Sequence, residues 1–161
     1  MEYIKDLVFN YVMASAFLGW FFAQVIKVLI ALLDKDKRSS FNVMFSTGGM
    51  PSSHSAAVTA LCFACGIQEG LGSAIFAISF VLAGVVIIDA SGVRYETGKQ
   101  AKLLNKISKK LFSKDEEEFE AGLKELVGHT PLQAFFGVLL GWCVVAVYCI
   151  LSRNGYMFAL V

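Results

Sequence analysis

The sequence predicts an all-α, polytopic membrane protein: a bundle of about four transmembrane helices with a cytoplasmic amphipathic helical hairpin. The first indication is composition, because 57% of the 161 residues are hydrophobic and 17% are charged, with a mean hydropathy of +0.64. Soluble domains have about 45–50% apolar and about 25% charged residues. The second indication is that the charged residues are confined to short stretches between long apolar runs. The length fits one membrane-embedded domain covering residues 1–161.

Four apolar runs are candidates for the transmembrane helices. The first is longer than the ~20 residues that cross a bilayer core, so it can span the core with tilt. The second is short, and it reaches spanning length only if its helix begins at Pro51 or Ser52. A re-entrant stretch at residues 41–45 is a candidate fifth membrane element. The four runs cover residues 7–33, 56–67, 71–88 and 132–151.

Residues 94–128 form the only soluble-looking segment of the chain. Its first half repeats Leu103, Leu104 and Ile107 at helical spacing among lysines, which is typical of a helix lying on an anionic membrane surface. Its second half begins near Ser113, which can cap a helix whose first turn is acidic. We therefore predict an inserted amphipathic helical hairpin, whose polar face is either solvated or binds a partner.

The positions of lysine and arginine predict how the bundle is oriented in the cell membrane. The loop after the first run carries Lys35, Lys37 and Arg38, and the 94–128 segment carries most of the other basic residues. Cytoplasmic loops have an excess of such residues. With four spans, both basic loops of this multi-pass protein lie on the cytoplasmic side, and both termini lie outside.

This topology brings unusual polar residues from four separate segments to the cytoplasmic end of the bundle. Lys27 lies near the end of the first run, His54 near the start of the second and Asp89 at the end of the third. His129 comes just before the fourth. Ionisable residues within membrane spans are costly, so by default they indicate function. Lys27 and Asp89 could also pair with each other.

The polar hinge before the second run has the features of an anion site. Gly48, Gly49, Ser52 and Ser53 come shortly before His54. The first amides of a helix have no intrahelical partner, so a glycine-rich turn that leads into a helix favours an anion. A histidine in the first helical turn can exchange a proton with that anion. The alternative is a hinge that only starts a helix.

The segment before the fourth run supplies a second histidine. Thr130, Pro131 and Gln133 form a capping box that starts a helix, which leaves His129 unexplained. Two histidines with cations around an anion pocket suit phosphoryl transfer, in which one imidazole attacks phosphorus and the other protonates the leaving oxygen. The sequence has no motif that demands a metal, so the predicted site contains neither metal nor cofactor.

Three ordered motifs resemble the divergent branch of the phosphatidic-acid-phosphatase type 2 superfamily, which is related to acid phosphatases and vanadium-dependent haloperoxidases. The motifs are GGMPSSHS at 48–55, DASGVR at 89–94 with GKQA at 98–101, and GHTP at 128–131. The resemblance covers roughly residues 18–141. It implies that His54 is the general acid of a membrane phosphatase, because the PSSH stretch matches the superfamily's Pro-Ser-Gly-His motif.

The chain departs from the active superfamily at its two other motifs. Lys27 is not followed seven residues later by Arg-Pro. Around His129, Leu123 stands at the arginine position and Gln133 at the aspartate position. The acidic and basic residues of the 89–94 segment are candidates to replace the missing groups.

The leading hypothesis is an integral membrane phosphatase that hydrolyses a phosphorylated lipid or isoprenoid by a metal-independent histidine mechanism at the cytoplasmic face. His129 is the nucleophile, His54 is the general acid and Asp89 orients a histidine. The predicted phosphate-binding residues are Lys27, Arg94, Lys99, Gly48, Gly49, Ser52 and Ser53.

Two other classes of protein remain open. A non-catalytic membrane protein could bind an anionic lipid headgroup through the same, degenerate site, and the altered motif around His129 favours it. A transporter fits less well, because the chain has no repeated half. Nucleic acid is not an expected partner, because aromatic residues are not interleaved with basic ones. Gly137 and Gly141 form a GxxxG pair that packs helices within the chain or between copies of a homo-oligomer.

Overall fold

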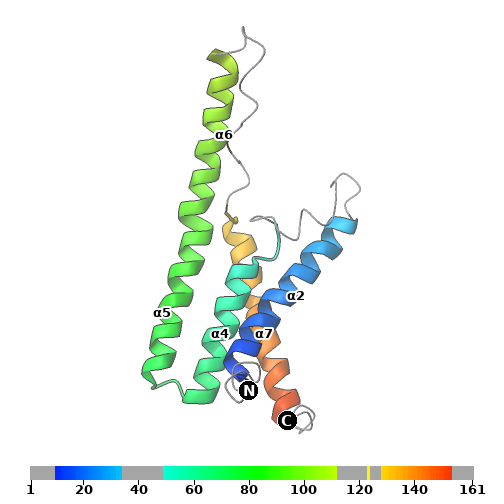
Figure 1. Ribbon diagram of the computed structural model, residues 1–161, viewed down its shortest axis with the longest axis vertical. Helices are drawn as coiled ribbons and strands as arrows, with labels where there is room; N and C mark the ends of the chain where they lie inside the picture. Colours follow the sequence, from blue (N-terminus) through cyan, green and yellow to red (C-terminus); the bar gives the residue numbers. More distant parts are fainter. Residues whose placement is uncertain (1–9, 34–48, 112–122, 124–127, 154–161) are drawn as a thin grey trace, which may run out of the picture.

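The computed structural model describes residues 10–33, 49–111, 123 and 128–153, and all secondary structure in these residues is helical (Figure 1). The predicted all-α class is therefore confirmed for the described residues. The re-entrant element expected at 41–45 lies outside them. In chain order the elements are α2 (Tyr11–Leu33), α4 (Ser53–Glu69), α5 (Ala74–Ile88), the π-helical turn η1 (Asp89–Val93), α6 (Arg94–Leu111) and α7 (Pro131–Arg153).

Three helices in the described part are long and apolar enough to cross a membrane. They are α2, the continuous helix from Ala74 to Ser108, and α7. The membrane character of the chain is thus supported by the fold. α4 has 17 residues, slightly fewer than the ~20 that a bilayer core requires. A fourth crossing by α4 stays a prediction.

α4 is the central helix, because it packs against α2, α5 and α7. Its Ala56, Ala60 and Ala64 are completely buried. A Cβ atom added to Gly137 or Gly141 of α7 would overlap a backbone carbonyl oxygen at the start of α4. Small residues at such interfaces let helices in membranes approach closely. The GxxxG pair therefore packs α7 against α4 within the chain, and its two glycines are not exposed to a second copy.

The predicted surface helix is not a separate element. α6 continues α5 through η1, so that residues 74–111 form one long helix beside the bundle (Figure 1). The 35 residues from Ala74 to Ser108 have a length of roughly 50 Å at 1.5 Å per residue. A bilayer core is only ~30 Å thick. The structure thus differs from the separate amphipathic helix predicted here, because η1 keeps the backbone helical and α6 continues in line with α5 (Figure 1). How α6 lies relative to the membrane surface stays a prediction.

The returning chain is bound to α6 at one described position. The Asn105 side chain donates to the carbonyl of Leu123 at 2.8 Å and accepts from its N–H at 2.9 Å. Leu123 is not helical, which differs from the helix predicted there. The other residues of the predicted second helix of the hairpin lie outside the described part of the chain.

Candidate functional site

Four segments that are distant in sequence meet at one end of the helix bundle, beside the middle of the long α5–α6 helix. These are the C-terminal half of α2, the N-terminal ends of α4 and α7, and η1 (Figure 1). The structure therefore brings together Lys27, His54, Asp89 and the chain around His129. Which side of the membrane this end faces stays a prediction.

His129 is held just before α7 by backbone contacts with η1 and α6. Its N–H donates to the Ala90 carbonyl at 2.9 Å. The preceding Gly128 has φ +90°, and a Cβ there would overlap the Tyr95 nitrogen. The side chain of His129 is 2% exposed, and neither ring nitrogen makes a hydrogen bond of acceptable geometry with the described residues. Buried polar groups in proteins usually have a hydrogen-bond partner, so this ring is a candidate to contact a ligand.

Lys27 projects from α2 toward the start of α4. It is 3% exposed, and its Nζ lies 3.5 Å from Ser53 Oγ. Its side chain also passes Gly49, where a Cβ would lie 3.9 Å from Lys27 Cδ. Lys27 forms no ion pair within the described residues. A buried ammonium that lacks an anionic partner carries a large desolvation cost, which a bound anion would offset.

The two histidines face each other beside Lys27. Their ring centroids are 6.4 Å apart, and the ring planes are inclined by 56°. His54 is exposed, whereas His129 is buried, so His54 lies at the open side of the pair. The charges of Arg94, Lys27 and Asp89 are all close enough to act on the His54 ring electrostatically. These two imidazoles and the ammonium therefore form one cluster.

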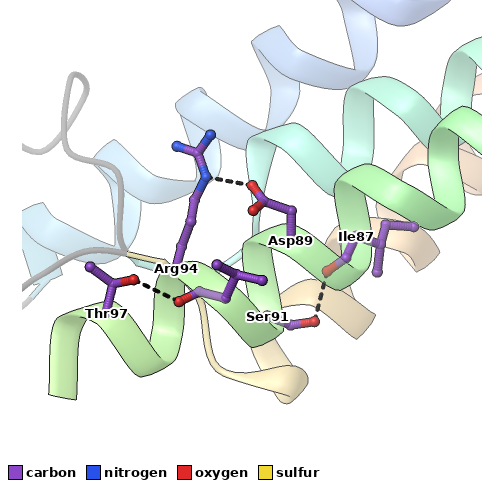
Figure 2. Close-up of polar contacts among 6 residues, drawn as sticks. Ile87, Asp89, Ser91, Arg94 and Thr97 are labelled. Carbon is purple, nitrogen blue, oxygen red and sulfur yellow. Dashed lines mark hydrogen bonds and ion pairs between the residues drawn. The ribbon is translucent and has the colours of Figure 1, made fainter. Parts of the chain in front are cut away.

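Asp89 does not contact a histidine or Lys27. Its Oδ2 accepts from Arg94 Nε at 2.6 Å across the π-helical turn (Figure 2). Both side chains are half exposed. The suggested Lys27–Asp89 pairing is therefore wrong, and the carboxylate is not in position to orient either ring. The wider turn of η1 places these two residues, five positions apart, on one side of the helix.

The hinge contributes both structural and accessible groups. Ser52 is completely buried, its N–H donates to the Gln133 carbonyl at 3.0 Å, and its Oγ accepts from the Ser55 N–H and hydroxyl. Ser52 is thus the N-cap of α4, and the structure gives it this role instead of a phosphate contact. Ser53 reaches Lys27, and Gly49 has φ +96° beside the same lysine. Gly48 lies outside the described residues.

Lys99 is engaged away from the cluster. Its Nζ pairs with Glu96 at 2.7 Å and lies 4.4 Å from the centroid of the Tyr95 ring. The pair is exposed on α6. The structure therefore provides no contact between Lys99 and the two histidines.

The predicted capping box is confirmed. The Thr130 N–H donates to Gln133 Oε1 at 3.1 Å, and the Gln133 N–H donates to Thr130 Oγ1 at 3.3 Å. Two positioning residues were missed by the sequence reasoning, namely Ala90, whose carbonyl holds the His129 backbone, and Gly128. The signal for Gly128 was its place directly before the histidine, because a glycine there permits positive φ and close backbone approach.

The environment of His129 favours the neutral imidazole. Burial lowers the pKa of His129, and the positive charge of Lys27 lowers that pKa further. The Gln133 side chain and the Gly49 backbone raise the pKa, but they lie outside good hydrogen-bond geometry. A neutral ring at pH 7 has the free electron pair that a nucleophile requires.

Among the described residues, no three His, Cys, Asp or Glu side chains gather as ligands for a metal ion. The groups that do gather are two imidazoles, one ammonium, a serine hydroxyl and the first turn of a helix. Such a donor set is suited to an oxyanion, because it provides positive charge and hydrogen-bond donors.

The fold and the site define a class: an all-helical membrane protein with a buried, cation-containing histidine cluster at one end of its bundle. Residues 8–144 match the Divergent PAP2 family, and the chain belongs to that family. The chain is also 40% identical over 146 residues to the Uncharacterized membrane protein YuiD of Bacillus subtilis (strain 168), an alignment that covers 84% of this chain and 92% of that protein. No solved structure matches the chain.

Proposed function

We propose that the protein is an integral membrane phosphatase that removes phosphate from a phosphorylated lipid or isoprenoid. The phosphate binds among Lys27, Ser53, His54 and His129, at the cytoplasmic face. Membership of the Divergent PAP2 family supports a phosphatase-related role. The family relationship alone does not establish the reaction, so the proposal depends on the geometry of the cluster.

The observation that carries the proposal is the unpaired, buried Lys27 beside a buried His129 whose ring nitrogens have no hydrogen-bond partner among the described residues. Burying such groups costs several kcal/mol unless they are paired. A phosphate would satisfy both of them, because it brings negative charge and several acceptor oxygens. The cluster is therefore incomplete without an anion.

The two imidazoles flank the proposed phosphate position, because their ring centroids are 6.4 Å apart and His54 lies at the open side of the pair. A nitrogen of neutral His129 attacks phosphorus, the P–O bond to the lipid breaks, and the leaving oxygen takes a proton from His54. Water then attacks the phosphohistidine, its proton passes to His54, the P–N bond breaks to return neutral His129, and inorganic phosphate is released.

The test is phosphate release by purified protein in bicelles that contain phosphatidic acid or a long-chain isoprenyl phosphate, with and without orthovanadate. We expect vanadate-sensitive turnover, which is lost in a His54→Gln, His129→Gln double variant. A Lys106→Gln variant serves as the matched control, because Lys106 is exposed on α6. Equal turnover by wild type and the double variant, or no turnover on either lipid class, would contradict the proposal.

A second function is favoured by one observation. Asp89 pairs with Arg94 and contacts neither histidine, so no described carboxylate orients the nucleophile. A protein that holds an anionic lipid headgroup without cleaving it is therefore the alternative. Binding of phosphatidic acid that depends on Lys27, together with no phosphate release, would favour this alternative.

A further inference from the structure

An apolar groove lies between α4 and α5 and has no protein occupant in the described part of the chain. Its volume is about 660 Å³, and its walls are almost entirely apolar. Binding sites for small molecules and cofactors have volumes of about 300–1,000 Å³. The groove is therefore large enough to hold a substantial part of a lipid molecule.

The groove begins close to the histidine cluster and runs along the bundle away from it. Thr59 lies at the end of the groove nearest the histidine cluster. It is five residues after His54, which is about 7–8 Å along a helix. Ile87, opposite, is two residues before Asp89. On α5 the groove extends from Ile87 back to Phe76, which is roughly 16 Å at 1.5 Å per residue. That length is about half of a ~30 Å bilayer core.

The wall of the groove is recessed at one glycine. A Cβ added to Gly84 of α5 would meet no atom within 4 Å. By contrast, backbone atoms at the start of α4 occupy the space that a Cβ would take at Gly19, Gly137 and Gly141. The small residues of α2 and α7 thus serve helix packing, whereas Gly84 leaves an empty apolar space. In a bilayer such a space is filled by hydrocarbon, because an apolar cavity does not hold water.

We propose that this groove seats the apolar chain of the lipid whose phosphate binds at Lys27, His54 and His129. The inference rests on the phosphate binding stated above and names its substrate class: a long-chain alkyl or isoprenyl phosphate. The phosphate anchors the molecule at the polar end, and the chain descends between α4 and α5 past Gly84. Discrimination between substrates then depends on chain length below the headgroup.

Photolabelling tests this placement without requiring turnover. The probes are a dodecyl phosphate with a mid-chain diazirine and the corresponding alcohol, both used with the full-length protein in bicelles, with labelled residues mapped by mass spectrometry. We expect the phosphate probe to label groove residues such as Phe63 and Phe80 at least five-fold more strongly than the alcohol does. Orthophosphate should compete with this labelling.

Two substitutions by phenylalanine separate the groove from the lipid-facing surface. Gly84→Phe fills the recess and should reduce the labelling by the phosphate probe at least five-fold. Val85→Phe is the matched control, because Val85 is 59% exposed and does not line the groove, and its labelling should equal that of the wild type. Thermal unfolding in detergent tests whether both variants are folded.

Three outcomes would overturn the inference. Equal labelling by phosphate and alcohol would mean that only bulk lipid fills the groove. Labelling of Ile26 and Cys143, which line the grooves between α2 and α7, would place the chain elsewhere. Labelling of Gly84→Phe at the wild-type level would show that the lipid chain does not occupy the recess at Gly84. A protein that is labelled as expected but releases no phosphate would instead fail only the proposed catalysis.

Discussion

The polar residues at the functional end of the bundle fall into two groups with opposite properties. The inner cluster consists of Lys27, His54 and His129, of which Lys27 and His129 are nearly inaccessible and lack full partners among the described residues. The outer pair, Asp89 and Arg94, is half exposed and already joined at 2.6 Å. Unsatisfied buried groups need a ligand, whereas a satisfied exposed ion pair contributes little. The difference locates the proposed chemistry in the inner cluster.

Replacement of the nucleophile should have the largest effect. We expect His129→Gln to lower the rate of phosphate release by more than about 10⁴-fold, because loss of the nucleophile removes the covalent route and exceeds the ~10²–10⁴-fold typical of general acid–base groups. The substitution keeps a polar side chain, so thermal unfolding should change little. A decrease of less than ten-fold would remove His129 from the reaction.

Removal of the buried charge should separate function from stability. A hydrogen bond to a charged group contributes about 1.5–3 kcal/mol, so Lys27→Met should weaken phosphate binding roughly 10–100-fold. The same variant should unfold at a higher temperature than the wild type, because an unpaired ammonium is no longer buried. Inhibition by phosphate and calorimetry measure the two effects, with exposed Lys106→Met as the control. A lower unfolding temperature for Lys27→Met than for the wild type would show that another group already neutralises the Lys27 charge in the folded protein.

Gly128 connects the inner cluster with the helix that carries the outer pair. Gly128→Ala places a Cβ against the Tyr95 backbone at φ +90°, which should destabilise the protein by about 1–3 kcal/mol and displace His129. Gly92→Ala is the matched control, because a Cβ there meets no atom within 4 Å. Chemical denaturation of both variants measures the difference. Equal stability would mean that this contact does not position His129.

Acid should reveal the burial of His129. Because the folded pKa of His129 lies below its usual value of about 6.5, the unfolded chain binds more protons as the pH falls below that value. Stability should therefore be lost as pH falls from about 6.5 toward the folded pKa, by at most about 1.4 kcal/mol per pH unit. We expect the melting temperature to fall less between pH 7.5 and 5.5 for His129→Gln than for the wild type.

Disruption of the outer pair should have the smallest effect. Exposed salt bridges contribute about 0.2–1 kcal/mol, so Asp89→Asn should lower the free energy of unfolding by less than about 1 kcal/mol. The rate of phosphate release should change by less than about five-fold. Charge-conserving Asp89→Glu serves as its comparison. A loss of 10²-fold or more in Asp89→Asn would place the carboxylate in the reaction and erase the distinction between the two groups.

Much of this arrangement was predictable from local sequence. The apolar runs indicated helices, the residues around Pro51 indicated where α4 begins, and the Thr130–Gln133 capping box indicated where α7 begins. Charge placement indicated that Lys27, His54, Asp89 and His129 lie toward one end. These features depend on residues a few positions apart, so local hydrogen bonding and hydropathy are sufficient to predict where each helix lies and where it begins.

Tertiary structure decided which of these residues work together. Whether Asp89 pairs with Lys27, a histidine or Arg94 depends on the phase of the helix, and η1 turned it toward Arg94. Likewise, α6 continued α5 where charge alone had predicted a surface helix. The sequence by itself determined the helices and the residues available for chemistry. Their pairing, burial and neighbouring groove required the packed structure, because those properties depend on distances between segments far apart in the chain.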